Sequence, residues 1–472
     1  MLEFETNLLH AENELLNEVK LFFYDLDADV KIKHYTTLTG NNSFNEIIIN
    51  DKKYRFNETI IFYNEIEKNK YYNRSCKKSV YKALKDFTKK FIPWGSLTGI
   101  RPTKIAYEFL NSGGNESGVE KYLIDEYDVS PSKAQLISDI VFNQKQSMIF
   151  DEKAYNFYVH IPFCSSRCSY CSFITFDSKS WEKSIPTYCD LLVKEIENSY
   201  KFREENGYNL FSTYVGGGTP TALDEENFEK VLSVIRPQGK EFTCEAGRPD
   251  TITQAKLDVM KKCGVTRVCV NPQSFNNTTL QTIGRNHTVE EFYEKYKLVK
   301  SYGFDINVDL IAGLPGETVS DFINSVDKAI ELMPSNLTVH TLSRKNGSTL
   351  KNSGKYDNAD IEKMIKYSSS VLPKYGYLPY YLYRQKAMLG NLENTGYCLK
   401  NKQCVNNITT MEEVISVDAC GAGAISKRVI GNGSRIERLA NLRDVKLYVE
   451  QFDERIEKKN AFNLADFNSK KE

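Results

Sequence analysis

Three cysteines, Cys164, Cys168 and Cys171, stand together in the segment FCSSRCSYCSF with the spacing C-x3-C-x2-C. For a chain with 11 cysteines in 472 residues, chance predicts only about 0.006 such triplets. Three thiolates on one short loop are suited to binding a soft metal centre. The spacing therefore indicates a metal site.

The number of available ligands distinguishes the metals that such a loop binds. A structural zinc site normally has four protein ligands, and the only nearby fourth ligand is His160, four residues before Cys164. Three cysteines on a 4Fe-4S cluster instead leave one iron open to an exogenous ligand. We therefore expect a 4Fe-4S cluster, with zinc or three unligated cysteines as the alternatives.

The composition indicates that these cysteines lie in a reducing environment. Lys plus Arg and Asp plus Glu each number 62, which argues against a chain that mainly coats nucleic acid or an anionic membrane. The sequence has no apolar run long enough to span a membrane, and its acidic start lacks the features of a signal peptide. We expect a cytoplasmic protein in which the eight scattered cysteines are small buried hydrophobic residues.

The elements that must position the cysteine loop follow a repeated strand–helix pattern from Tyr155 onward. Apolar or β-branched runs predict strands at 157–161, 213–217, 242–246, 267–272, 306–311 and 337–342. Helical spacing predicts intervening helices at 187–202, 225–235, 252–263 and 289–302. About six such units predict an α/β fold, a parallel sheet curved into a partial (β/α)6 barrel. The chemistry of such folds lies at the C-terminal ends of the strands.

The barrel, expected over 151–350, is flanked by two other regions. Residues 1–150 predict an N-terminal α+β domain, with a helix over 8–23 and two strands around an Asp51-Lys52 turn. One further helix there has a lysine-rich face, formed by Lys77, Lys78, Lys82, Lys85, Lys89 and Lys90. Such a lysine-rich face is typical of a helix surface exposed to solvent. The alternative is that this face is a dock, meaning a binding site for an acidic ligand. Residues 351–472 form a mixed C-terminal region that we expect to cover the barrel mouth and the substrate.

Glycines and polar residues recur where the predicted strands end. The second strand ends in Gly216, Gly217 and Gly218 before Thr219, where the backbone can approach a ligand closely. The polar candidates at or near the later strand ends are Glu245, Gln273, Arg285 and Asp309. Each alone is more often a satisfied polar residue, but together they lie where one ligand can meet them all.

The cysteine spacing, on a loop after the first barrel strand, resembles that of the radical S-adenosylmethionine (SAM) superfamily. The resemblance implies that the open iron holds the amino and carboxylate groups of SAM, and that an electron from the cluster cleaves SAM to methionine and a 5′-deoxyadenosyl radical. It implies that Tyr170 packs by the adenine and that Gly217, Gly218 and Thr219 lie near the SAM amino group. It also implies SAM contacts from Glu245, Gln273, Arg285 and Asp309. The carboxylates suit ribose hydroxyls or the ammonium group, and Arg285 suits the methionine carboxylate.

The resemblance becomes narrower over four motifs, YVHIPFCSSRCSYCSF, YVGGGTPT, IGRNH and DLIAGLPGET. Together they are similar to the oxygen-independent coproporphyrinogen III oxidase family. The flanking segments WGSLTGIRPTK, YRQKAMLGNLENTGY and DACGAGAISK resemble its coproporphyrinogen dehydrogenase branch of low-GC bacteria. The family implies oxidative decarboxylation of two propionates of coproporphyrinogen III to vinyl groups, which gives protoporphyrinogen IX in haem biosynthesis. It also implies that Tyr158 and His160 lie near SAM and the reacting site.

The implied partners are a tetra-anionic tetrapyrrole and an electron donor such as flavodoxin or ferredoxin, without nucleic acid. Cations are needed to bind the substrate carboxylates, and the candidates are Arg384, Lys386, Arg101 and Lys104. Three nearby aromatic residues are suited to lining the macrocycle: Tyr380, Tyr381 and Tyr383. Surface structural roles are the alternative for these residues.

One departure from the family pattern leaves rival functions open. Some members have a further cysteine two residues after the third cluster cysteine, where this chain has Phe173. The resulting CxxxCxxCxF pattern also occurs in related haem chaperones, although their H-N-x-x-Y-W signature is absent here. A binding protein of that kind is therefore one alternative. A radical SAM methyltransferase or haem-ring-opening enzyme is another, since a shared fold does not fix function.

Overall fold

A computed structural model describes residues 2–23, 29–99, 101–148, 151–173, 175–343, 347–352, 358–385, 388–431, 433 and 435–469. The chain divides into two compact units, Met1–Ser138 and Asp139–Glu472. The boundary falls within one helix, Pro131–Gln144. Among the described residues, no helix combines the length and the apolar character that a membrane span requires.

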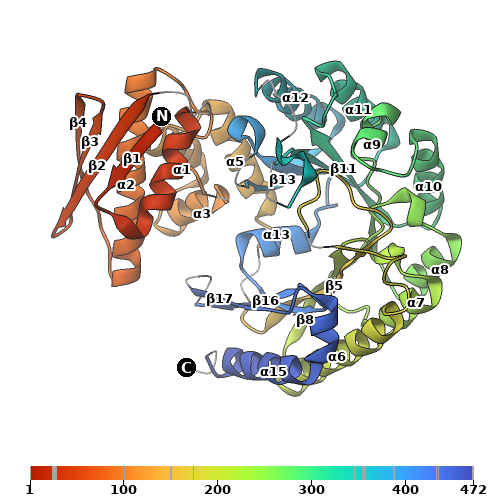
Figure 1. Cartoon of the computed structure of the whole chain (residues 1–472). Helices are drawn as coiled ribbons and strands as arrows, with labels where there is room; N and C mark the ends of the chain where they lie inside the picture. Colours follow the sequence, from red (N-terminus) through yellow and green to blue (C-terminus); the bar gives the residue numbers. More distant parts are fainter. Residues whose placement is uncertain are drawn as a thin grey trace. The chain divides into compact units, whose positions relative to one another are not determined.

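The first unit is a four-stranded sheet packed against helices (Figure 1). Its strands are β1 (Leu2–Thr6), β2 (Val30–Thr39), β3 (Asn42–Ile49) and β4 (Lys52–Thr59), in that order. Its helices are α1 (Glu12–Phe22), α2 (Glu65–Thr88), α3 (Thr103–Asn111), α4 (Val119–Tyr127) and the start of α5 (Pro131–Gln144). Alternate residues of β2 and β3, such as Ile32 and Ile47, are buried and share a core with Leu15 of α1 and Leu84 of α2.

Two boundaries of this unit differ from the sequence prediction. The helix expected over 8–23 begins at Glu12, because Leu9–Ala11 forms a 3-10 turn. The hairpin turn is at Asn50 and Asp51, one residue before its predicted place. Asn50 has φ of 52°, a left-handed conformation that asparagine tolerates better than most residues.

The second unit contains the predicted parallel strands in the form of a partial barrel (Figure 1). They are β5 (Ala154–Ile161), β8 (Asn209–Gly217), β9 (Glu241–Glu245), β10 (Arg267–Cys269), β11 (Asp305–Ala312) and β12 (Asn336–Thr341), each parallel to its neighbour. The helices around them are α6 (Ile185–Glu205), α7 (Glu225–Ser233), α8 (Gln254–Lys262), α9 (Asn277–Thr282), α10 (Val289–Ser301), α11 (Val319–Leu332) and α12 (Asn358–Val371). The predicted α/β class and partial barrel are confirmed.

The C-terminal region lengthens this sheet at both edges. Beyond β12 lie β14 (Asn394–Cys398) and β13 (Leu378–Tyr383), both antiparallel to their neighbours. Beyond β5 lie β15 (Ser416–Cys420), β16 (Ile425–Ile430) and β17 (Arg435–Ala440), of which β15 is parallel to β5. The remaining helices are α13 (Val405–Glu412), α14 (Val445–Glu450) and α15 (Phe452–Ser469). The region over 351–472 is therefore part of the barrel sheet, and its role in covering substrate stays a prediction.

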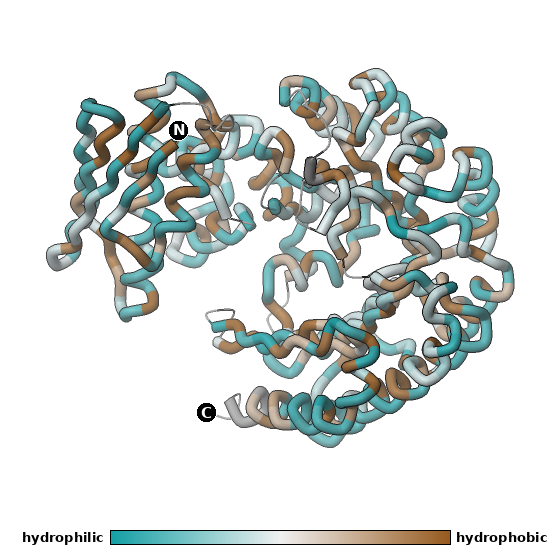
Figure 2. The backbone as a smooth tube through the Cα atoms, viewed as in Figure 1, coloured by the Kyte–Doolittle hydropathy of each residue, from teal (hydrophilic) through white to brown (hydrophobic). Residues whose placement is uncertain are grey.

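Alternation along β5 separates the core from the site. Phe157, Val159 and Ile161 belong to the main hydrophobic core, and the Phe157 ring stacks on Tyr200 of α6 with centroids 4.4 Å apart. Tyr158 and His160 alternate with these residues and are only partly buried. They therefore point to the opposite, inner face of the sheet. The tube in Figure 2 shows hydrophilic residues alternating with hydrophobic ones along the surrounding helices.

Candidate functional site

The cysteine loop follows β5 and is tied to the ends of other elements. Cys164 closes the short strand β6 (Phe163–Cys164), which pairs with β7 (Phe176–Asp177). Backbone N–H groups of Gly218 and Thr219 donate to the carbonyl oxygens of Ile161 and Phe163, both at 2.7 Å. The Ser169 N–H donates to the Ile283 oxygen at 3.0 Å, and the Cys171 N–H donates to the Cys168 oxygen at 3.1 Å. The loop is therefore fixed by β8 and by the end of α9.

The three cysteine thiols lie close enough together to affect one another's pKa. Burial raises the pKa of Cys164 and of Cys171, and the proximity of Cys168 adds to both shifts. The Thr219 hydroxyl donates to Cys164 Sγ at 3.5 Å, and Arg248 Nη1 donates to Cys168 Sγ at 3.2 Å. No group of three or more described His, Cys, Asp or Glu side chains is arranged to hold a single metal ion. A structural zinc site normally takes four protein ligands, whereas three cysteines are enough to hold a 4Fe-4S cluster with one open iron, so three thiols on this loop fit a cluster by their number.

The glycine run at the end of β8 allows the site residues to approach one another. A Cβ at Gly217 would lie 2.5 Å from the His160 ring, and one at Gly218 would lie 2.5 Å from the Phe163 oxygen. A Cβ at Gly216 would lie 2.8 Å from the Glu245 carboxyl carbon. Because any side chain here would collide with a neighbour, the run must lack side chains. The protein's own site residues therefore require glycine here, and the close approach of this backbone to a ligand stays a prediction.

Glu245 is the last residue of β9, and its carboxyl group has a raised pKa. Burial raises the pKa of its carboxyl to about 7, and the nearby charge of Asp309 raises it further. The Tyr214 hydroxyl donates to Glu245 Oε1 at 2.7 Å and opposes that rise. The carboxyl is therefore close to half ionised near neutral pH.

Asp309 in β11 is held in its ionised form. Burial alone would raise its pKa, but His340 and hydrogen bonds from neighbours outweigh this effect and lower the pKa. Asn271 Nδ2 and Asn307 Nδ2 each donate to the carboxylate at 2.8 Å, and His340 Nε2 lies 3.7 Å from Asp309 Oδ2. The Tyr383 hydroxyl lies 3.3 Å from His340 Nδ1. Of the three predicted macrocycle-lining tyrosines, Tyr383 therefore adjoins this group.

Arg285 and Tyr170 lie beside the second cluster cysteine. Arg285 Nη2 donates to the carbonyl oxygens of Gly247 and Asn271 at 3.0 and 2.6 Å. Burial raises the pKa of Tyr170 well above its usual value, whereas Arg285 lowers it and a hydrogen bond with Cys168 raises it. Tyr170 of the cysteine loop and Arg285, which follows α9, are thus brought together beside Cys168.

Unpartnered buried atoms mark the places where a polar ligand fits. Gln273 has a left-handed backbone with φ of 67°, and its Oε1 has no hydrogen-bond partner in the described structure. Asn271 Oδ1 and Arg285 Nε are also buried there without a partner. Such atoms are destabilising unless a ligand satisfies them. Their mixture of donors and acceptors, next to a three-thiol loop, fits a cluster with SAM.

The two predicted catalytic residues lie on the inner face of β5. Burial lowers the pKa of His160 to about 4, so its imidazole is neutral near pH 7. The Tyr158 ring centroid lies 6.1 Å from those of His160 and Tyr214. Tyr158 and His160 therefore line the region into which Glu245 and the glycine run also project.

Three site residues were missed from the sequence: Arg248, Asn271 and His340. Arg248 follows Glu245 by three residues and is 3% exposed. Asn271 and His340 contact Asp309 from β-strand ends on either side of β11. The sequence did contain one signal for these residues: each lies within or just after a predicted barrel strand.

The arginines, lysines and tyrosines predicted to contact the substrate differ in their burial and in their partners. Arg384 is only 4% exposed, and its Nη2 donates to the Asn391 oxygen at 3.2 Å. Tyr380 and Tyr381 are buried against Cys398 and Cys404. Lys386 lies outside the described residues. Arg101 and Lys104 belong to the first unit, and their role toward a substrate stays a prediction.

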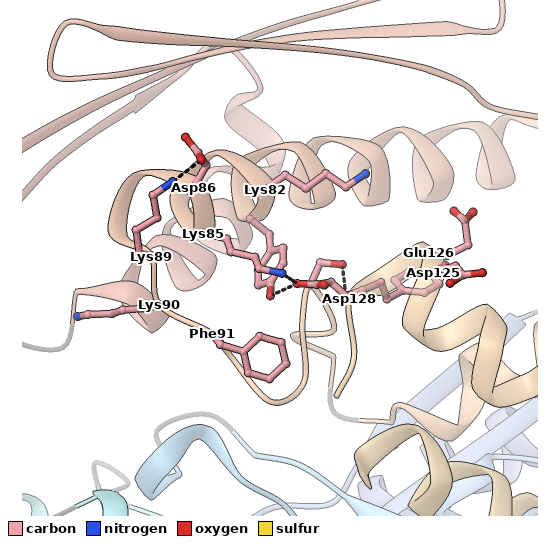
Figure 3. A pocket seen from close by; sticks show the side chains of 12 residues that line it. Lys82, Lys85, Asp86, Lys89, Lys90, Phe91, Asp125, Glu126 and Asp128 are labelled. Carbon is pink, nitrogen blue, oxygen red and sulfur yellow. Dashed lines mark hydrogen bonds and ion pairs between the residues drawn. The ribbon is translucent and has the colours of Figure 1, made fainter. Parts of the chain in front are cut away.

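The lysine-rich face of α2 borders an open pocket in the first unit (Figure 3). Lys85 pairs with Asp128 at 2.5 Å and Lys89 pairs with Asp86 at 2.6 Å. Lys77 and Lys78 also pair with carboxylates, and Lys90 Nζ donates to the Phe22 oxygen at 2.7 Å. Four of the six lysines thus pair with carboxylates, which fits the interpretation of a solvated face better than a dock for an acidic ligand.

Comparison with known proteins identifies the family of this chain. The family model of the radical SAM superfamily matches residues 158–329. The oxygen-independent coproporphyrinogen-III oxidase-like protein HemZ of Bacillus subtilis is 40% identical over 376 residues, 76% of this chain and 75% of that protein. The chain therefore belongs to the radical SAM superfamily, in the family of oxygen-independent coproporphyrinogen-III oxidase-like proteins. Its cofactors are those of the superfamily, a 4Fe-4S cluster and SAM.

Two further relatives share a smaller part of the chain. The haem chaperone HemW of Bacillus subtilis is 32% identical over 192 residues, 39% of this chain and 49% of the chaperone. The solved structure of the coproporphyrinogen III oxidase HemN of Escherichia coli has a TM-score of 0.51 and 22% identity. That match covers 66% of this chain and 72% of HemN, and it shows a shared fold.

Proposed function

We propose that this protein is an oxidoreductase that decarboxylates two propionates of coproporphyrinogen III to give protoporphyrinogen IX. The observation that supports this proposal most is the 376-residue similarity to the coproporphyrinogen-III oxidase-like HemZ. That similarity extends well beyond the radical SAM core at 158–329. It therefore includes flanking segments that a shared cofactor alone would not explain.

In this proposal, the chain's own residues bind the cluster and SAM. When bound, the cluster and SAM would supply a radical strong enough to remove a hydrogen atom from an unactivated carbon. Cys164, Cys168 and Cys171 would hold the cluster. Glu245 and Asp309 would accept hydrogen bonds from the ribose or the ammonium group, and Arg285 would pair with the methionine carboxylate. Tyr170 would pack by the adenine, with Gln273, Gly217, Gly218 and Thr219 as further contacts.

The inner face of the barrel would hold the substrate away from water. Tyr158, Tyr214 and Tyr383 provide aromatic surface there, and neutral His160 is an uncharged neighbour for the reacting propionate. Each propionate would lose a hydrogen atom from its β-carbon and then carbon dioxide, which leaves a vinyl group. One electron would pass at each step to an external one-electron acceptor. We infer that a flavodoxin or ferredoxin provides the electron that cleaves SAM.

A product assay tests the proposal. Anaerobically reconstituted protein, SAM, a reductant and coproporphyrinogen III should yield protoporphyrinogen IX and methionine, measured by mass spectrometry. Cys168→Ala is the matched control, and we expect it to lose iron and all product. Wild-type protein that contains about four irons per chain and cleaves SAM, but leaves the tetrapyrrole intact, would contradict the decarboxylation.

Haem binding and transfer is the second candidate function. Phe173, which stands where some oxidases have a fourth cysteine, is 63% exposed, and the chain is 32% identical to a haem chaperone over 192 residues. Tight haem binding without SAM-dependent loss of carbon dioxide would support this candidate. Spectroscopic haem titration beside the product assay distinguishes the two functions.

A further inference from the structure

Arg248 is a buried cation placed on the cluster loop from outside that loop. It follows β9 at the start of the 3-10 turn Pro249–Thr251, and its side chain is 3% exposed. Its Nη1 donates to Cys168 Sγ and to the Ser166 carbonyl oxygen, both at 3.2 Å. Its Nη2 donates to the Ser166 hydroxyl at 2.6 Å. One guanidinium thus holds the second cysteine and the spacer before it.

Asp250 forms an ion pair with Arg248 and also contacts the cysteine loop. Asp250 Oδ1 lies 3.4 Å from Arg248 Nε, and its Oδ2 accepts a hydrogen bond from the Ser165 hydroxyl at 2.8 Å. Arg248 Nε itself has no hydrogen-bond partner in the described structure. The C-x3-C spacer is therefore bound by a cation and an anion from the same turn.

The other two arginines near the loop make different contacts. Arg285 Nη2 donates to main-chain oxygens of Gly247 and Asn271. Arg167 Nη2 donates to the Gly347 oxygen at 2.9 Å. In the described part of the chain, Arg248 is thus the arginine with a hydrogen bond to a ligand sulfur.

We propose that Arg248 is a positioning residue that raises the reduction potential of the iron–sulfur cluster through its N–H bond to Cys168 Sγ. Reduction adds negative charge to a cluster that three thiolates already make electron-rich. A hydrogen bond and a positive charge at a ligand sulfur stabilise that added charge and raise the potential. Burial strengthens the effect, because water does not screen it. This effect acts on the cluster alone, whichever tetrapyrrole reaction follows.

An EPR-monitored redox titration of the reconstituted protein without SAM or tetrapyrrole tests this role. Arg248→Gln removes the charge, and we expect a more negative midpoint potential. A tenfold lower ratio of reduced to oxidised cluster at fixed poise would correspond to ~59 mV for this one-electron couple. Arg248→Lys keeps the charge but loses the fork that contacts Cys168 and Ser166 together, so we expect a smaller negative shift.

Ser166→Ala is the matched control for a purely structural clamp. It removes the 2.6 Å contact with Arg248 Nη2 but leaves the N–H bond to Cys168. We expect this variant to keep the wild-type potential. Wild-type potentials in both Arg248 variants would overturn the proposal. If Arg248→Gln loses its iron, a wild-type potential in Arg248→Lys would overturn it equally.

Discussion

Two carboxyl groups, Glu245 on β9 and Asp309 on β11, have different protonation states because their partners differ. Burial raises the pKa of Glu245 to about 7, whereas hydrogen bonds keep the pKa of Asp309 below its ordinary value. Both are removed from water, so the difference comes from their partners. Asp309 receives two amide donors and faces His340, but Glu245 faces a tyrosine hydroxyl and the negative charge of Asp309 itself. One acid is therefore a permanent anion, and the other responds to pH.

This difference predicts a pH-dependent contribution of Glu245 to stability. The pKa of Glu245 is raised from 4.5 to about 7 in the folded chain, so its protonated form is favoured by folding. The stabilisation is complete below the unfolded pKa and disappears as pH rises through the folded pKa. We expect the free energy of unfolding of wild type, relative to Glu245→Gln, to fall by up to about 3 kcal/mol between pH 4.5 and 8. Urea unfolding of the apoprotein measures this, and a pH-independent difference would contradict it.

At the scale of elements, the C-terminal helix α15 supports the strand beside the site. β15 ends at Cys420, and a Cβ at the following Gly421 would lie 2.3 Å from the His160 backbone oxygen. The Gly421 N–H donates to Glu195 of α6 at 2.9 Å. Lys459 of α15 pairs with Glu195 at 3.2 Å and with Asp418 of β15 at 3.0 Å. A buried charge network thus fixes the backbone against which His160 rests.

Breaking that network should destabilise the fold strongly. Lys459 is 3% exposed. Lys459→Met removes the buried cation that pairs with Glu195 and with one carboxylate oxygen of Asp418. We expect a loss of about 3 kcal/mol in unfolding free energy. The neighbouring Lys458→Ala is the matched control, because its pair with Glu454 is about half exposed and should leave the denaturation midpoint almost unchanged. Equal midpoints for the two variants would show that the network contributes little.

Local sequence patterns predicted the six barrel strands but not β15. The six barrel strands are short apolar runs between helical stretches, and each lay within a few residues of its predicted place. β15 was not predicted because its run SVDAC is short and contains the buried Asp418. Its neighbour β5 lies more than 250 residues away in the chain, since Ser416 pairs with Tyr155, and local patterns do not encode such pairing. Arg248 was missed for a related reason: arginine is usually exposed, and only the folded loop brings it to Cys168.

Of the two compact units, the first contains the four-stranded sheet and the second contains the cysteine loop. The first unit has its own core, in which Val19, Ile47 and Leu84 are fully buried. All three cluster cysteines, and the described partners of their thiols, lie within the second unit. The described contacts of the cluster cysteines thus come from the second unit.

This separation predicts that the second unit takes up its cluster without the first. A chain that begins at Pro131 keeps α5 whole, including Gln144, which is fully buried and donates to Glu412 at 3.2 Å. After anaerobic reconstitution we expect it to hold about four irons per chain, with the EPR spectrum of the full-length protein. Cys168→Ala in the same truncated chain is the control for adventitious iron. Loss of the cluster, in a truncated chain that still unfolds cooperatively, would show that the N-terminal unit is needed to assemble the site.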